Sequence, residues 1–194
     1  MNLKRSSKFE FHDHDAFRDR HAFFMTASKA HWLRYSVEKF ISSYKSAMAK
    51  ERGTELHALA AKLISFGQKL PRSERTLNRY VNDAIGFGMK PEQVLVYSAN
   101  CFGTADAISF KDNKLRIHDL KTGTIPASMD QLMVYAALFC LEYGITVKDI
   151  SIELRIYQND DINICEPTSE EVLDIMDIIT SRDKLIEDIR EGRI

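Results

Sequence analysis

Three polar side chains in the middle of the chain have the types and spacing needed for metal-dependent chemistry. Asp106 ends the motif Gly103-Thr-Ala-Asp106, and Asp119 and Lys121 follow as Asp-Leu-Lys. Carboxylate oxygens are preferred ligands of hard cations such as Mg²⁺ and Mn²⁺. An ammonium beside them can orient or deprotonate a water molecule, or stabilise charge on a phosphate. The trio therefore suits metal-assisted hydrolysis of phosphodiesters.

The register of the expected hairpin decides whether the two carboxylates meet. Three cross-strand pairs are expected around the turn 111–114: Phe110 with Leu115, Ile108 with Ile117, and Asp106 with Asp119. Directly opposed residues have Cβ atoms about 4.5–5.5 Å apart, and carboxylates that close repel each other unless a cation separates them. Lys121, two residues beyond Asp119, projects from the same face. The spacing alone leaves open a plainer interpretation, an exposed ion pair near a turn.

Length and composition place the chain among ordinary globular proteins. It has 194 residues, 44% of them hydrophobic and 28% charged, which excludes a disordered or collagenous chain. No apolar run is long enough to span a membrane, and three scattered cysteines favour the reducing cytoplasm. A net charge of -1 neither implies nor excludes nucleic acid as a partner.

Periodicity predicts one domain over 1–194, in the order helices, three strands, helix, strand, helix. A polar segment over 1–25 is followed by a core over 26–157 and by a C-terminal helix over 168–191, which opens on a Thr168/Glu171 capping box. The expected core elements are helices over 26–41, 47–66, 75–85 and 129–143, and strands over 93–98, 102–110, 115–121 and 150–157. This order predicts an α/β fold with a mixed central β-sheet flanked by helices.

Four motifs in order resemble the PD-(D/E)XK nuclease superfamily, specifically its RecB-like exonuclease branch. They are Arg52-Gly-Thr-Glu-Leu-His57, Gly103-Thr-Ala-Asp106, Asp119-Leu-Lys121 and Gln131-Leu-Met-Val-Tyr135. The resemblance covers about residues 26–136. It implies a restriction-endonuclease-like core and a metal-dependent deoxyribonuclease.

The resemblance also implies roles for individual residues. His57, Asp106, Asp119 and the backbone carbonyl of Leu120 would bind Mg²⁺ or Mn²⁺, and Lys121 would be the catalytic lysine. Gln131 and Tyr135, which share a helix face, would contact the DNA strand. Glu55 is expected to lie near the site without binding the ion. It is two residues from His57, and residues with this spacing on a helix point in different directions. The cysteines are too few for the iron–sulfur cluster that many relatives hold.

Exonuclease action in phage or prophage DNA recombination, repair or processing follows from the same resemblance. The expected partners are DNA and one of three proteins: a recombinase, a helicase or a single-strand-binding protein. The expected location is the cytoplasm of a bacterial host. A homo-oligomer is compatible with the sequence, and a membrane partner is not expected. The alternative is a catalytically inactive DNA-binding or assembly protein that keeps the nuclease fold.

Two weaker patterns have plainer explanations. His12-Asp-His-Asp15 is more typical of a solvated polar segment than of a metal site. Arg72, Arg75 and Arg79 are spaced along a short helix, so they either contact phosphates or form a solvated helix face.

Overall fold

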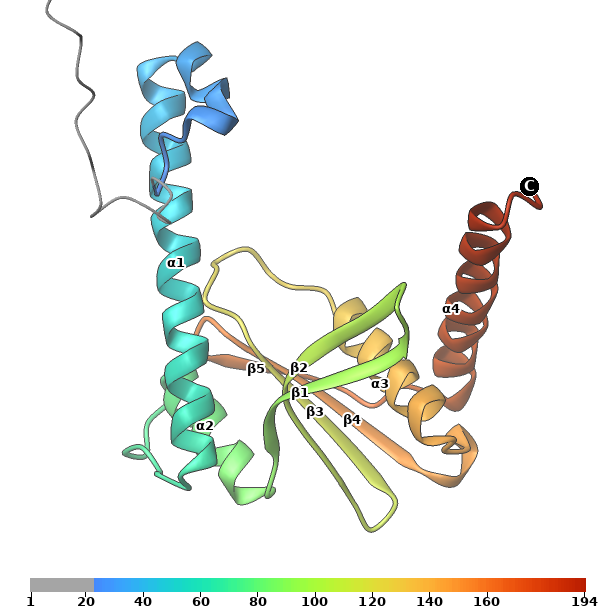
Figure 1. Cartoon of the computed structure of the whole chain (residues 1–194). Coiled ribbons are helices and arrows are strands. Elements are labelled where there is room, and N and C mark those ends of the chain that lie inside the picture. Colours follow the sequence, from blue (N-terminus) through green and yellow to red (C-terminus); the bar gives the residue numbers. More distant parts are fainter. Residues whose placement is uncertain (1–22) are drawn as a thin grey trace, which may run out of the picture. The chain divides into compact units, whose positions relative to one another are not determined.

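The computed structural model describes residues 23–194 (Figure 1), and the described part divides into two units between Met48 and Ala49. Each unit is described by itself. The motif His12-Asp-His-Asp15, and most of the polar segment expected over 1–25, lie outside the described residues. No helix of the described part is long and apolar enough to cross a membrane.

In the first unit, a 3-10 helix replaces the start of the expected first helix. This helix, η2, covers Ala27–Arg34 and is followed by extended backbone at Tyr35. The α-helix α1 then runs over Val37–Ser65 without interruption. The prediction of separate helices over 26–41 and 47–66 was therefore wrong, because residues 42–46 contain no glycine or proline that would end a helix.

An aromatic cluster holds the described part of the first unit together. The ring of Phe24 packs edge-on against Phe40, with centroids 5.3 Å apart, and against Tyr44 at 5.4 Å. The ring of Phe23 also packs edge-on against Tyr44. These edge-to-face contacts have the geometry that aromatic quadrupoles favour, so they fix the chain before α1 against the start of that helix.

The second unit is built on a five-stranded mixed sheet in the order β1-β2-β3-β4-β5. Its strands are β1 Lys90–Ser98, β2 Cys101–Lys111, β3 Lys114–Leu120, β4 Ser151–Gln158 and β5 Asp161–Cys165. Only β3 and β4 are parallel. A parallel pair needs a crossover connection, which helix α3 (Asp130–Tyr143) supplies, and the short helix η3 (Val147–Asp149) follows it. Strand β5 was not expected from the sequence.

Helices cover the sheet on two sides and enclose two hydrophobic cores (Figure 1). One core joins the sheet to α3 and to α4 (Ser169–Arg190), and includes Ile108, Ile117 and Leu138. The other joins it to α1 and to α2 (Thr76–Gly86), and includes Ala60 and Tyr157. The expected mixed sheet flanked by helices is confirmed.

Local signals also account for two helix ends. Thr168 and Glu171 form the complete capping box at the start of α4, which satisfies backbone donors that the first turn leaves free. Gly144 ends α3 with φ of 62°, in the left-handed region where glycine has no steric cost.

Candidate metal and phosphodiester site

The β2–β3 hairpin has the register that its apolar residues require. Phe110 pairs with Leu115 and Ile108 with Ile117, and both isoleucines enter the core beneath α3. The residues Asp112 and Asn113 form the turn with positive φ, which Asn and Asp tolerate better than most residues. The predicted register is confirmed for these two pairs.

Asp106 and Asp119 are not a bonded cross-strand pair, because the ladder ends one position earlier at Ala107–His118. The Oδ2 atom of Asp106 instead accepts a hydrogen bond of 2.9 Å from the backbone N–H of Leu120. The structure differs here from the expected direct opposition of the two carboxylates. The bond fixes the Asp106 carboxylate against the last residue of β3.

A second partner of Asp106 comes from α1. His57 Nδ1 lies 3.2 Å from Asp106 Oδ2, an ion pair when the imidazole is protonated. The hydrogen bond to Asp106 raises the pKa of His57; burial opposes this shift, and the negative charges of Asp106, Asp119 and Glu92 reinforce it. An imidazole with several carboxylates around it faces a strongly negative space, which favours a cation.

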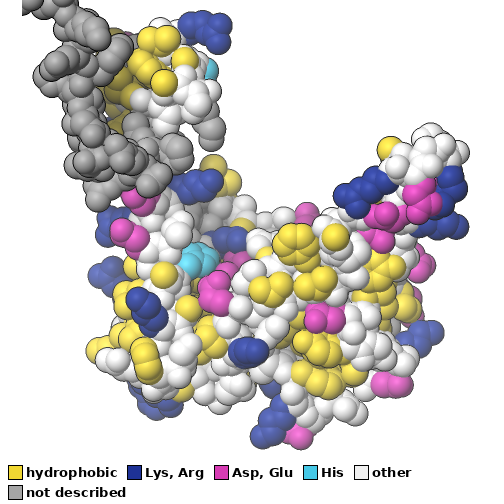
Figure 2. Space-filling model, viewed as in Figure 1, with side chains coloured by type: hydrophobic (Ala, Val, Ile, Leu, Met, Phe, Trp, Pro, Cys, Tyr) yellow, Lys and Arg dark blue, Asp and Glu magenta, His cyan; other side chains and the backbone are white. Residues whose placement is uncertain are grey.

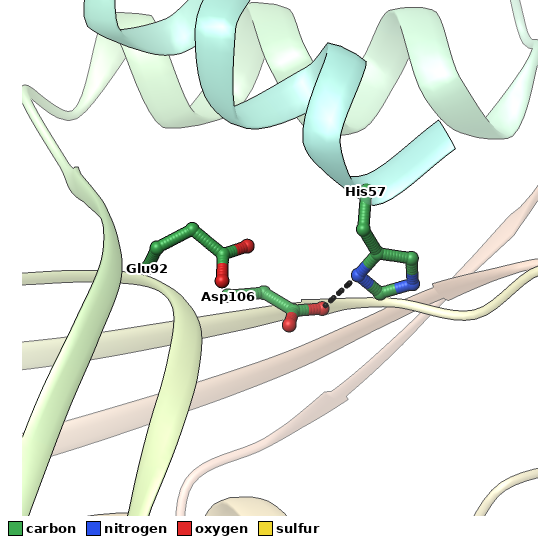
Figure 3. A group of neighbouring side chains, drawn as sticks. All are labelled: His57, Glu92 and Asp106. Carbon is green, nitrogen blue, oxygen red and sulfur yellow. Dashed lines mark ion pairs between the residues drawn. The ribbon is translucent and has the colours of Figure 1, made fainter. Parts of the chain in front are cut away.

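Glu92 completes a cluster with His57 and Asp106 (Figure 3). Each of the three residues offers one donor atom, and these atoms all lie within 4.8 Å of one another. Partial desolvation and then the charge of Asp106 raise the pKa of Glu92. The side chains of His57 and Asp106 are 28% and 16% exposed, and Glu92 is exposed, so the cluster is open to solvent. Figure 2 shows a cyan histidine surface next to a magenta acidic surface on this face of the molecule.

The backbone of Glu92 is held in an unusual conformation. Its φ is 50°, a value that is uncommon for residues other than glycine and that carries strain of order 1–3 kcal/mol. The neighbouring pairs Pro91–Ala107 and Gln93–Ala105 place Glu92 opposite Asp106. The strained residue is thus the one whose carboxylate joins the cluster, and strain of this kind often marks functional sites.

Asp119 and Lys121 form a second polar group beside the first. The Lys121 amine donates to Asp119 Oδ1 at 3.0 Å and lies 2.9 Å from Oδ2. Burial and then the charge of Asp106 raise the pKa of Asp119, while Lys121 lowers it. Asp119 is 2% exposed. A buried carboxylate requires a cationic partner, and the amine of Lys121 supplies one.

Helix α3 positions the lysine through a chain of polar contacts. Lys121 donates to Gln131 Oε1 at 2.8 Å, and Gln131 Nε2 donates to the Tyr135 hydroxyl at 3.0 Å. Gln131 and Tyr135 are four residues apart and therefore lie on one face of α3. The two residues expected to contact DNA thus hold the amine of Lys121 in a fixed direction.

Gly103 is needed at its position because the ring of Tyr135 lies against it. A Cβ atom added to Gly103 would lie 2.8 Å from Tyr135 Cε1, closer than real Cβ atoms approach other atoms. Gly103→Ala is therefore expected to displace the ring and to destabilise the protein by about 1–3 kcal/mol. Urea unfolding followed by circular dichroism measures this loss.

The matched control for Gly103→Ala is Gly123→Ala, since a Cβ atom at Gly123 would have open space around it. A second measurement isolates the contact: in a Tyr135→Leu background the cost of Gly103→Ala should largely disappear, because the two residues no longer collide. An equal cost in both backgrounds would show that the ring contact is not the reason for the glycine.

The structure gives the remaining predicted residues different roles. Leu120 contributes its backbone N–H to Asp106, whereas the expectation concerned its carbonyl. Glu55 is exposed and, within residues 23–194, has no hydrogen bond or ion pair with a site residue. Arg79 pairs with Glu74 at 3.1 Å and donates to the carbonyl of Asp160, which favours a structural role for this arginine.

Glu92 is the residue that the sequence analysis missed. A signal was present, because Pro91-Glu92 opens a strand whose pairing with Gly103-Thr-Ala-Asp106 places the two carboxylates opposite each other. This signal can be used only when the pairing of β1 with β2 is known. That pairing shifts between Val96 and Ser98, so simple counting back from the turn does not give it.

A family model described as "Protein of unknown function (DUF2800)" matches residues 91–185. The match includes Glu92, Asp106, Asp119 and Lys121, and leaves out His57. No curated protein and no solved structure matches the chain.

Proposed function

We propose that this protein is a metal-dependent deoxyribonuclease. The observation that carries the proposal is the juxtaposition of two groups: the donors His57, Glu92 and Asp106 within 4.8 Å of one another, and the buried Asp119 with an amine at 2.9 Å. A cation-binding cluster beside a fixed lysine suits metal-assisted hydrolysis of phosphodiesters. The order of the four sequence motifs supports DNA as the substrate.

The nitrogen and oxygen donors fit Mg²⁺ or Mn²⁺, with the imidazole favouring Mn²⁺. When bound, such an ion polarises the phosphate and lowers the pKa of a bound water molecule. His57, Glu92 and Asp106 would hold it, and Asp119 adds a further carboxylate whose charge acts on His57. The ion would offset the mutual repulsion of these carboxylates.

Lys121 would act on the water or the phosphate. Its amine is held between the Asp119 carboxylate and Gln131 Oε1, so its position is fixed from two sides. Gln131 is in turn fixed by Tyr135. A preorganised donor of this kind stabilises developing charge without further reorganisation. Exonuclease action, and a role in phage DNA recombination, repair or processing, rest on the resemblance to RecB-like exonucleases.

The test combines hydrolysis with metal binding. Purified protein with Mn²⁺ should degrade linear DNA and stop when EDTA is added. Isothermal titration calorimetry should show Mn²⁺ binding, and Glu92→Gln should weaken it about 10-fold or more, because one charged ligand is lost. Failure of the wild-type protein to bind Mn²⁺ would exclude the proposed function.

A DNA-binding or assembly protein without turnover is the second candidate. The net charge of -1 is compatible with this candidate. One experiment distinguishes the two candidates. A binding protein without turnover should bind DNA and leave it intact in the presence of Mn²⁺, even at high protein concentration, whereas a nuclease should degrade it. Release of nucleotides that disappears in Asp119→Asn would exclude it.

A further inference from the structure

A pocket of about 590 Å³ lies beside the start of β1 and the C-terminal end of β2. The ladder between these strands ends there, at the pair Lys90–Ile108. Its walls come from the end of α2, from both strands and from the C-terminal end of α3. The volume lies within the range of ligand sites. No acidic residue lines this pocket, which is formed entirely by described residues.

Three aromatic rings from β2 and α3 follow one another along one wall. Phe139 lies between Phe110 and Tyr143, with ring centroids 5.1 Å and 5.0 Å from its own. Phe139 is 7% exposed, whereas Phe110 is 40% and Tyr143 52% exposed. The buried ring thus supports two outer rings whose surfaces face solvent. Exposed aromatic rings on a rigid base are the usual surfaces on which nucleobases stack.

Two lysines add positive charge to the pocket. Lys90 and Lys111 both line it, and both are exposed. Neither forms an ion pair with another described residue, in contrast to Lys114 on the next strand, which pairs with Glu153 at 2.8 Å. Free amines beside exposed rings match the phosphates and bases of a nucleic acid strand.

The pocket and the metal cluster lie next to each other along β1. Lys90 and Gln93 line the pocket, and Glu92 between them belongs to the cluster. Lys90 and Glu92 are two residues apart, about 7 Å along a strand.

We propose that this pocket binds bases of a single-stranded DNA segment adjoining the phosphate that is cut. Phe110 and Tyr143 stack on the bases, and Lys90 and Lys111 contact the phosphates. The proposal rests on the proposed function for the position of the cut. It specifies the substrate further: a strand with unpaired bases next to the site, because the faces of bases within a duplex are already stacked on the neighbouring base pairs.

Binding of a 20-nucleotide oligo(dT) tests the rings. Fluorescence anisotropy in EDTA measures affinity without cleavage. Phe110→Leu and Tyr143→Leu, which keep an apolar side chain and remove the ring, are each expected to weaken binding about 5- to 150-fold, the usual range for one stacked base. Phe102→Leu is the matched control, because Phe102 is an exposed phenylalanine on the same strand and outside the pocket.

The same series on an abasic 20-mer separates stacking from a folding defect. Without bases the ring substitutions should change nothing, whereas an equal loss on both strands would overturn the proposal. Lys90→Ala and Lys111→Ala should each reduce the slope of log affinity against log salt by about 0.7. A dimer in light scattering that dissociates in Tyr143→Leu would instead assign the pocket to a second copy of the chain, and would also overturn the proposal.

Hydrolysis of bis(p-nitrophenyl) phosphate with Mn²⁺ distinguishes failure of the pocket from failure of the proposed function. This small substrate does not need the pocket, so Phe110→Leu should hydrolyse it as the wild type does. Wild-type protein that binds oligo(dT) but hydrolyses nothing would contradict the nuclease and leave the pocket standing. Normal hydrolysis with unchanged oligo(dT) affinity in the ring variants would contradict the pocket alone.

Discussion

Replacing Lys121 with methionine is expected to lower the rate of DNA hydrolysis about 10²–10⁴-fold, the range seen when a positioned proton donor or charge-stabilising group is removed. The amine of Lys121 contacts both Asp119 and Gln131, so no other described side chain occupies its position. Initial rates on end-labelled linear DNA at saturating Mn²⁺ measure the effect. Metal affinity should change far less, since Lys121 does not belong to the cluster of donor atoms formed by His57, Glu92 and Asp106.

The control for Lys121→Met is Lys121→Arg. Methionine leaves the buried Asp119 carboxylate without its cation, and removal of one partner of a buried ion pair is destabilising. Arginine keeps the positive charge beside Asp119 while changing the geometry and acidity of the donor. We therefore expect near wild-type thermal stability and a loss of activity similar to that of methionine. Activity of the Lys121→Arg variant close to that of the wild type would show that only the charge, and not the amine, is required.

Asp106→Asn is expected to lower Mn²⁺ affinity about 100-fold or more, because changes of residues outside the ligand shell already cost 10- to 100-fold. The asparagine oxygen can still accept the bond from the Leu120 N–H, so the hairpin should stay in register. The change removes the charge that faces His57 and Glu92. Hydrolysis should fall with metal affinity.

Thermal unfolding gives a readout of Asp106→Asn that does not depend on activity. A bound ion stabilises the folded state by about 2.7 kcal/mol at 100 times its dissociation constant, so Mn²⁺ should raise the melting temperature of the wild type and not that of Asp106→Asn. Asp112→Asn carries the same substitution at the turn of the same hairpin and should keep the full rise. A Mn²⁺-induced rise that survives in Asp106→Asn would place the ion elsewhere.

The apolar pattern was sufficient to predict the strand register but not every side-chain contact. Phe110 pairs with Leu115 and Ile108 with Ile117 as expected, because a shift of one residue would turn both apolar pairs away from the core. Asp106 lies beyond the last ladder pair and has no such constraint. Its direction is set by the Leu120 N–H and by His57, contacts that the strand pattern does not contain.

Two glycines occupy positions that helix and strand propensities do not explain. Gly53 lies inside α1, where glycine is unfavourable, and a Cβ atom there would lie 2.7 Å from Thr122 Oγ1. Gly103 is required by the ring of Tyr135 in the same way. Gly53 lets α1 approach the segment that follows Lys121, and Gly103 lets α3 approach β2; no local signal indicates either contact.

Strand β5 and residue Glu92 were missed for a related reason. Asp161–Cys165 is only five residues long and pairs with β4 through the turn at Asn159 and Asp160, so its pattern is too short to identify alone. Glu92 was missed because a single glutamate forms no periodic pattern that would assign it to a site. Its role becomes visible only when β1 lies beside β2.

The sequence by itself determined the order of the main elements, the register of the β2–β3 hairpin and the placing of Asp119 and Lys121 on one strand end, since these follow from hydrophobic periodicity and residue spacing. The tertiary structure decided that His57 and Glu92 meet Asp106, that Gln131 holds the lysine, and that aromatic rings from β2 and α3 form one pocket. Those contacts join residues from separate elements, and only the packing of helices on the sheet fixes their distances.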